Sequence, residues 1–258
     1  MVNEGNGAPR DVVAFPGAGA FGGEFRALRG ALPSGARLAA LQYPGRAAAP
    51  PGPTSFEDLV TACAARICDR PGPPCVLLGH SFGAFVAYAT ASALQAAGTG
   101  VAALVVVGAD APDRVRPPVE AARSREATRA YLGGIGDDVL GQVPDDEWRE
   151  IVVDTAWWDL VLLTAFPGPA RVRLRCPVLA VRGRDDPITA DDRMSAWAGT
   201  TVGGFASASL PGGHTDVLSS PEFLTRVSPL VTRSVVGTTG TTGATDAPGP
   251  AAEGPAPG

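Results

Sequence analysis

Short apolar runs alternate along the chain with stretches that have helical periodicity. The runs are apolar throughout, a pattern typical of strands buried on both faces of a parallel sheet. They cover residues 12–15, 37–41, 75–78, 102–107, 177–181 and 205–210. Helical patterns cover residues 22–32, 54–70, 84–97, 191–198 and 221–235. The alternation predicts an α/β fold with a mostly parallel sheet, helices on both faces, and a site at the carboxyl ends of the strands.

One segment, at about residues 113–169, interrupts the alternation. Its pattern is helical, and it contains three of the four tryptophans, Trp148, Trp157 and Trp158. We expect it to form an inserted helical lid over the strand ends. The folded unit should span residues 8–236, because residues 237–258 have no Val, Ile, Leu, Met or aromatic side chain to bury and should be disordered.

Composition narrows the range of functions. All 21 basic residues are arginine, so a phosphate-binding loop or a Schiff-base mechanism that needs lysine is excluded. The net charge of −5 gives no electrostatic basis for binding nucleic acid. The longest apolar run, residues 101–107, is too short to cross a membrane, and the first ten residues contain no apolar signal core. We therefore expect a soluble, cytoplasmic protein, monomeric, with no nucleic-acid or membrane partner.

Cysteine and histidine are scarce. The four cysteines have no C-x-x-C spacing, and there are only two histidines. This pattern argues against a zinc site, so we predict no metal and no cofactor, with the cysteines reduced and buried.

The clearest chemical signal is a G-x-S-x-G motif at residues 79–83, with an apolar strand before it and an alanine-rich helix after it. A sharp strand-to-helix turn would expose Ser81 at a helix N-terminus, where backbone N–H groups favour a negative charge. We predict that Ser81 is a nucleophile. The Phe82 N–H should be one oxyanion donor, and the Ala18 N–H, in the glycine-rich turn after the first strand, the other.

A serine nucleophile needs a base. His80 adjoins Ser81 and should point away from it at such a turn. His214 follows the last predicted strand and should reach the same edge of the sheet, so elimination favours His214.

A carboxylate must then orient the imidazole. We favour Asp186, in the turn at residues 183–187, which gives the chain order Ser, Asp, His of α/β-hydrolases. Asp185 and Asp110 remain alternatives, the latter because some hydrolases take the acid from the preceding strand.

Five motifs taken together resemble a known family, the type II thioesterases that accompany polyketide synthases and nonribosomal peptide synthetases. In order, the motifs are Phe15-Pro16-Gly17-Ala18-Gly19, Gln42-Tyr43-Pro44-Gly45-Arg46, Gly79-His80-Ser81-Phe82-Gly83-Ala84, Gly183-Arg184-Asp185-Asp186-Pro187 and Pro211-Gly212-Gly213-His214. The Tyr-Pro-Gly-Arg element is the most specific of them. The resemblance implies an α/β-hydrolase fold and a free-standing editing enzyme that hydrolyses acyl groups from the phosphopantetheine thiol of acyl or peptidyl carrier proteins.

Three other functions are compatible with these motifs. A chain-releasing or cyclising thioesterase would more often use Asp110 and be fused to a synthase. A general carboxylesterase would prefer oxygen esters. A carrier-binding module without activity should lack a triad residue. The lid suggests one further hypothesis: the basic stretch 114–129 could attract an acidic carrier, although a solvated helix face explains it as well.

Overall fold

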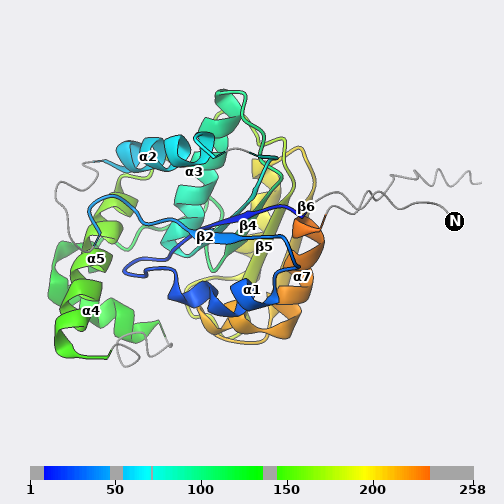
Figure 1. Ribbon diagram of the computed structural model, residues 1–258. Helices are drawn as coiled ribbons and strands as arrows, with labels where there is room; N and C mark the ends of the chain where they lie inside the picture. The colour runs from blue at the N-terminus through cyan, green and yellow to red at the C-terminus, as the bar shows by residue number, and fades with distance from the viewer. Residues whose placement is uncertain (1–8, 47–54, 71, 136–143, 233–258) are drawn as a thin grey trace, which may run out of the picture.

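The computed structural model describes residues 9–46, 55–70, 72–135 and 144–232 (Figure 1). In this part of the chain, six strands form one sheet in the order β2-β1-β3-β4-β5-β6, and every neighbouring pair is parallel. The strands are β1 (Val12–Phe15), β2 (Leu38–Ala40), β3 (Val76–His80), β4 (Ala103–Val107), β5 (Val178–Gly183) and β6 (Phe205–Leu210). The predicted parallel sheet is confirmed.

Within the described ranges, six α-helices lie between these strands and a seventh follows β6. They are α1 (Arg26–Ala31), α2 (Phe56–Cys68), α3 (Phe82–Ala96), α4 (Arg125–Gly134), α5 (Asp146–Thr164), α6 (Asp191–Ser195) and α7 (Pro221–Val231), with short 3₁₀ helices at Gly23–Phe25, Ala121–Arg123, Ala196–Thr200 and Asp216–Ser219. Figure 1 shows α2 and α3 on one side of the sheet and α1 and α7 on the other. The sheet is therefore covered on both faces, as predicted.

The strands divide their side chains between two apolar cores. On β1, Val13 and Phe15 join the core under α2 and α3, whereas Val12 and Ala14 join the core under α1 and α7. This division follows from the period of two along a strand, which sends successive side chains to opposite faces. A strand buried on both faces must be apolar at every position, which is why the runs were recognisable in the sequence.

The strand order reverses between β1 and β3. From β1 the chain crosses to β2 on one side, and from β3 it crosses to β4 on the other. The segments that leave the carboxyl ends of β1 and β3 therefore diverge, and ligand sites of open α/β sheets lie at such a reversal. Ser81 directly follows β3, and the glycine-rich turn that contains Ala18 directly follows β1.

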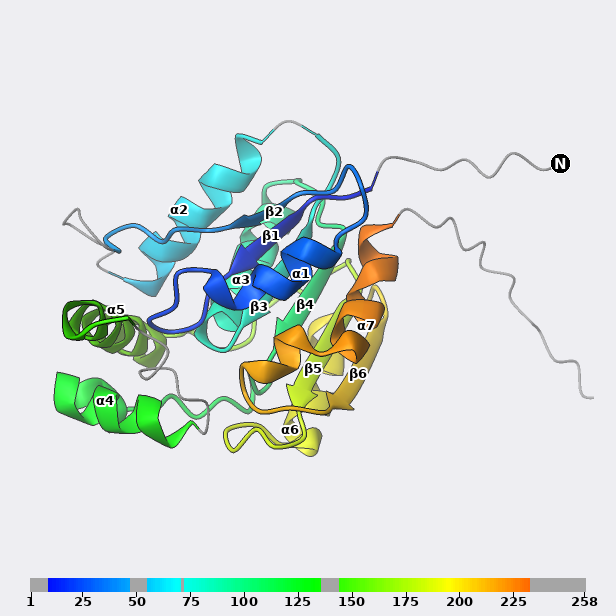
Figure 2. The same ribbon diagram turned by 60° about the horizontal axis from the view of Figure 1, so that its bottom comes forward.

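The segment between β4 and β5 carries the helices α4 and α5. Figures 1 and 2 both show these helices beside each other, and the end of α5 also packs into the core under α2 and α3. Helices α4 and α5 share a small apolar cluster of their own, and Ala18 and Phe21, from the segment after β1, pack against it. The lid helices therefore touch the same segment that was predicted to supply an oxyanion donor.

Several element boundaries differ from the prediction. The helix expected at residues 22–32 begins as a 3₁₀ turn, and α3 begins at Phe82 rather than residue 84, so Ser81 alone separates strand from helix. The hydroxyl that caps α2 belongs to Ser55, which accepts from the Asp58 N–H; Thr54, where the predicted helix began, lies outside the described residues. The same holds for residues 233–236 and for the tail at 237–258.

Two burial predictions were too general. β6 is at the edge of the sheet and has exposed positions at Ala206 and Ser207, so it is not buried on both faces. All four cysteines are free, but Cys68, the last residue of α2, is exposed rather than buried. Across the described residues, no helix is long and apolar enough to cross a membrane.

Candidate active site

The backbone at Ser81 is strained in the way the strand-to-helix turn requires. Its φ is 53° and its ψ is −122°, and it is the one non-glycine residue with positive φ in the described ranges. Such a conformation costs on the order of 1–3 kcal/mol and persists only where the surroundings enforce it. Here the Ser81 N–H donates to the Val107 carbonyl at 2.8 Å and the Ser81 carbonyl accepts from the Ala84 N–H at 2.9 Å.

The two glycines of the motif are explained by close contacts. A Cβ atom on Gly79 would lie 2.4 Å from the Gly83 carbonyl oxygen, and one on Gly83 would lie 2.0 Å from the Phe15 carbonyl oxygen. Both distances are far inside van der Waals contact, so α3 could not begin so close to β1 and β3 with any side chain at these positions. The turn that presents Ser81 therefore depends on both glycines.

His214 and Asp186 form a buried pair. The Nδ1 atom of His214 lies 3.0 Å from Oδ2 of Asp186. The same carboxylate accepts a hydrogen bond from the Thr189 hydroxyl at 2.7 Å and one from the Ile188 N–H at 2.8 Å. Burial by itself would raise the pKa of this carboxyl, but the three hydrogen bonds favour its ionised form more strongly and lower the pKa to about 2.

The charge of Asp186 fixes the tautomer of His214. An ionised carboxylate can only accept, so the Nδ1 atom must carry the proton. The lone pair of neutral His214 is then on Nε2, which is the arrangement that a general base requires. The structure thus brings together the histidine and the carboxylate that the sequence analysis favoured.

The two rival carboxylates lie elsewhere. Asp185 is exposed. Asp110 is buried after β4, and its Oδ2 atom pairs with Nη1 of Arg193 at 3.1 Å. Its Oδ1 atom is buried without a hydrogen-bond partner among the described residues. Burial raises the pKa of Asp110, and the Arg193 charge offsets this only in part. Neither residue contacts His214 in place of Asp186.

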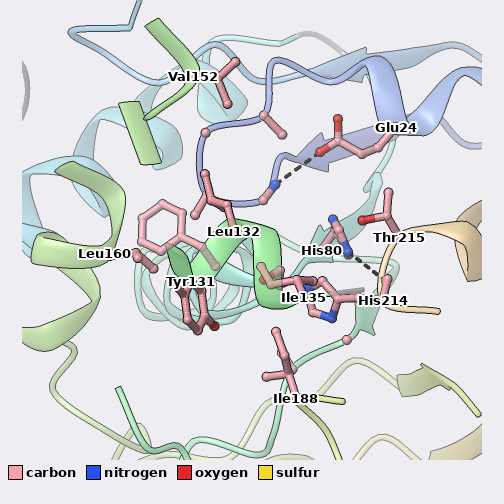
Figure 3. Close-up of a pocket in the computed structure, with 18 of the residues that line it drawn as sticks. Glu24, His80, Tyr131, Leu132, Ile135, Val152, Leu160, Ile188, His214 and Thr215 are labelled. Atoms are coloured by element: carbon pink, nitrogen blue, oxygen red, sulfur yellow. Dashed lines mark hydrogen bonds between the residues drawn. The ribbon is translucent and has the colours of Figure 1, made fainter. Parts of the chain in front are cut away.

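His80 supports the His214 loop. Its Nε2 atom lies 3.1 Å from the His214 carbonyl oxygen, and the two imidazole rings are 5.0 Å apart (Figure 3). Because a carbonyl can only accept, Nε2 must be the protonated nitrogen of His80. Burial, together with the proximity of His214, lowers the pKa of His80 to about 3, so the ring is neutral at ordinary pH. His214 is therefore a better candidate than His80 for the general base that deprotonates Ser81.

No hydrogen bond joins Ser81 to His214 in this structure. The Nε2 atom of His214 is buried and has no partner in the part of the chain that is described. Both residues nevertheless line the same cavity. In unliganded sites such a bond is often open and forms only when substrate is bound, so the geometry is compatible with a base and a nucleophile that act together.

The expected oxyanion donors also line this cavity. Ala18 and Phe82 both border it, next to Ser81. Their amides make no hydrogen bond to any described residue, whereas the amides on either side of Ala18 are both occupied: Gly17 N–H donates to Glu24 at 3.2 Å and Gly19 N–H donates to Asp159 at 2.9 Å. Both amides predicted from the sequence are thus available to a substrate.

The cavity is large, and side chains of the lid form most of its apolar wall. Its volume is about 1070 Å³. Figure 3 shows Tyr131 and Leu132 of α4 and Leu160 of α5 on one side, with His80 and His214 on another. Trp148 also lines it, but Trp157 instead donates to the Ala122 carbonyl inside the lid. The lid therefore supplies apolar walls large enough for a carbon chain.

No group of three or more His, Cys, Asp or Glu side chains in the described ranges could hold a metal ion.

The family of the chain follows from its similarity to known proteins. Residues 10–230 match the sequence profile of the thioesterase domain family. The chain belongs to that family. It is 27% identical over 208 residues to a probable cadicidin biosynthesis thioesterase of Streptomyces griseus, a match that covers 79% of this chain. It is 30% identical over 218 residues to the phenyloxazoline synthase MbtB of Mycobacterium tuberculosis, covering 81% of this chain. The matches span 57% of the first relative's length and 15% of the second's.

Solved thioesterases share the fold. The RedJ thioesterase of the prodiginine pathway in Streptomyces coelicolor is 26% identical, with a TM-score of 0.78 and 86% of each chain covered. The type II thioesterase BorB, from the borrelidin biosynthetic cluster, is 25% identical, with a TM-score of 0.76 and coverage of 86% of this chain and 93% of BorB. The thioesterase described here therefore has the α/β-hydrolase fold, and the family resemblance seen in its motifs is confirmed.

Two residues that support the site were missed in the sequence. Thr189 donates to Asp186 from three residues away, a spacing at which local side-chain hydrogen bonds are common, so a signal was present. Asp159 is a carboxylate set among Trp157, Trp158 and a run of leucines, and a charged residue in such a run is rarely buried without a partner. That partner is Arg46, which no local pattern could identify.

Proposed function

We propose that this thioesterase hydrolyses acyl thioesters carried on the phosphopantetheine arm of carrier proteins, in polyketide or nonribosomal peptide biosynthesis. The observation that carries the proposal is that His214, held by the buried carboxylate of Asp186, lines the same cavity as the strained Ser81. The cavity's apolar lid side suits the acyl chain. The relatives named for biosynthetic pathways support the choice of substrate.

The mechanism is two acyl transfers. Ser81 Oγ attacks the thioester carbonyl while Nε2 of His214 takes its proton, and the pantetheine thiol leaves with a proton returned from His214. Water, deprotonated by His214, then cleaves the acyl-serine. The N–H groups of Ala18 and Phe82 stabilise the oxyanion in both steps, each by about 3 kcal/mol. Asp186 holds the tautomer throughout. The residues of the chain perform every step, and no cofactor is required.

The carrier must approach the rim of the cavity, where charge would guide it. Most arginines of the basic lid stretch are already paired: Arg123 with Glu120 at 2.7 Å, Arg129 with Glu150 at 2.7 Å, and Arg125 with Asp154. Lid acids thus neutralise most of the stretch that was expected to attract a carrier.

Two arginines at the rim, Arg26 and, from the basic stretch, Arg116, are better placed for that role. Arg26 and Arg116 border the cavity, are exposed, and form no ion pair with any described residue. They are the cations we propose for the carrier or its phosphate.

The substrate test compares acyl-pantetheine thioesters, acyl-carrier protein and oxygen esters of the same acids. The proposal predicts a clear preference for thioesters and no turnover by Ser81→Ala. A fluorophosphonate probe should label Ser81 in the wild type. A preference for oxygen esters would support a carboxylesterase, and cyclic products would support a cyclising enzyme. The absence of labelling at Ser81 would indicate a carrier-binding module without activity.

The docking test uses the double variant Arg26→Gln, Arg116→Gln, with Arg123→Gln as the control from the paired stretch. The double variant should raise KM for acyl-carrier protein about 3- to 10-fold and leave KM for an acyl-pantetheine within twofold, because rim charges act mainly on encounter with a charged partner. Equal effects on both substrates would exclude docking by these arginines.

A further inference from the structure

The Tyr-Pro-Gly-Arg element has no role in the mechanism above. In the structure it lies against the segment that follows β1, residues 16–20, which we call the oxyanion loop because it contains Ala18. Tyr43 is buried and its hydroxyl donates to the Pro16 carbonyl at 3.0 Å. The element therefore contacts the loop that must present an N–H group to the substrate.

Arg46 holds the peptide that carries this N–H. Its Nη2 atom donates to the Gly17 carbonyl at 3.3 Å, and its Nη1 atom donates to the Ala20 carbonyl. The Gly17 carbonyl and the Ala18 N–H belong to one planar trans peptide, in which the two groups point in opposite directions. The Gly17 carbonyl also accepts from the Ala20 N–H at 3.1 Å, so the guanidinium and this turn bond together fix the direction of the Ala18 N–H, away from Arg46.

Asp159, on the lid helix α5, holds the other side of Ala18. Its Oδ2 atom accepts from the Gly19 N–H at 2.9 Å and from Nη2 of Arg46. The side chains of Arg46 and Asp159 are only 4% and 5% exposed, so the pair is shielded from water. One carboxylate thus joins the arginine, the oxyanion loop and the lid.

The loop also packs directly against α5. Gly19 has a φ of +73°, and a Cβ atom there would lie 2.8 Å from the Val152 carbonyl oxygen and 2.9 Å from the Ala156 Cβ. Figure 3 shows Val152 beside the loop. With no space between the two backbones, α5 cannot move toward or away from the sheet without disturbing the hydrogen bonds around Ala18.

A buried ion pair adds little net stability, because desolvation of both charges offsets their attraction. The geometric effect of the pair is more specific. Arginine suits it because the planar fork donates in several directions at once, and the guanidinium stacks on the Tyr43 ring at 4.3 Å. A lysine ammonium could not hold Gly17, Ala20 and Asp159 in the same way.

We propose that Arg46 and Asp159 are positioning residues, which hold the Gly17–Ala18 peptide so that the Ala18 N–H faces the oxyanion and which tie that orientation to the lid helix α5. The inference rests on the proposed function, since it assumes that Ala18 is an oxyanion donor. It gives the Tyr-Pro-Gly-Arg element a role in the reaction without contact with the substrate.

The test is a comparison of two inhibitors with the same acyl chain. In a trifluoromethyl ketone, Ser81 Oγ adds to the carbonyl carbon, its proton passes to His214, and the resulting oxyanion needs the hole. A thioether analogue, with a methylene in place of the carbonyl, forms no oxyanion. Arg46→Met should weaken the ketone at least 10-fold and the thioether less than 3-fold. The same variant should lower kcat about 10- to 100-fold with KM within 3-fold.

The control and the second variant lie on α5. Asp154→Asn removes the carboxylate of an exposed pair with Arg125 and should leave both inhibitors unchanged. Asp159→Asn keeps the volume of the buried side chain and should weaken the ketone selectively, which preserves the test if Arg46→Met does not fold. Arg46→Lys should recover only part of the ketone affinity.

Equal weakening of both inhibitors, or unchanged ketone affinity in Arg46→Met and Asp159→Asn, would overturn the proposal. The wild type separates this outcome from a failure of the proposed function. If the wild type binds the ketone but does not prefer thioesters, the proposed substrate is wrong. The ketone affinities of the variants then still test the positioning role of Arg46 and Asp159.

Discussion

The loops that follow the neighbouring strands β4 and β5 each carry a buried carboxylate, and the two carboxylates differ sharply. Asp186 accepts from His214, Thr189 and Ile188, and its pKa is lowered to about 2. Asp110 has Arg193 as its ion partner, one oxygen without a hydrogen-bond partner among the described residues, and a raised pKa. Burial is common to both, so the number of well-placed donors decides which carboxylate is held ionised beside the histidine.

The source of the donors explains the difference. Ile188 and Thr189 follow Asp186 by two and three residues, so the β5 loop organises the carboxylate locally before His214 approaches from the loop after β6. Asp110 depends instead on Arg193 of helix α6 and on the Ala190 backbone, both of which are far from it along the chain. A carboxylate that accepts hydrogen bonds from its own turn can therefore orient the histidine better than a carboxylate that relies on a partly exposed side chain.

The largest expected effect comes from removing the charge that orients His214. Asp186→Asn should lower kcat about 10⁴-fold, because the amide can donate to Nδ1 and favour the wrong tautomer. Steady-state hydrolysis of an acyl-pantetheine measures it. A loss of less than 10-fold would mean that Asp186 is not the acid of the triad.

A smaller loss should follow from removing one donor to that acid. Thr189→Val deletes a hydrogen bond to a charged group, worth about 1.5–3 kcal/mol, and should lower kcat by roughly 10-fold and by no more than about 100-fold. Thr200→Val is the matched control, since the buried Thr200 hydroxyl donates only to the Trp197 carbonyl. If both variants retain full activity, the local donors are not what distinguishes the β5 loop.

An Asp→Asn substitution at Asp110 should have the smallest effect on activity. Asp110→Asn should leave kcat/KM within about 3-fold of the wild type, because the side chain makes no contact with His214. Assayed beside Asp186→Asn, it tests the comparison directly. Losses of equal size in the two variants would show that the hydrogen-bond pattern does not identify the acid.

The buried His80 should make the stability of the folded state depend on pH. His80 has a folded pKa of about 3, below the ordinary value of 6.5, so between these values the unfolded chain binds a proton that the folded chain does not. Stability must therefore fall as pH falls from 6.5 toward 3, by up to about 1.4 kcal/mol per pH unit from this group. Urea unfolding of His80→Gln between pH 6.5 and 5 should show a shallower decline than the wild type. Parallel curves would contradict the assignment of His80 as a buried neutral ring.

Much of the fold was predictable because its signals are local. Apolar runs mark the strands of a sheet buried on both faces, and the G-x-S-x-G motif between a strand and a helix marks the turn at Ser81. The prediction was weaker where the surroundings of an element matter: β6 resembles the other strands in its sequence pattern but is exposed at the edge, and α2 begins at Phe56 rather than at residue 54.

The class of fold, the order of the three triad candidates and the family resemblance could be read from the sequence, since these follow from periodicity and short motifs. The choice between Asp186 and Asp110 as the partner of His214 required the folded structure. The folded structure also decided that Arg46 meets Asp159, 113 residues away, across the loop that contains Ala18. The physical reason is that propensity and periodicity act over a few residues, whereas the contacts of a buried charge depend on which strands and helices become neighbours.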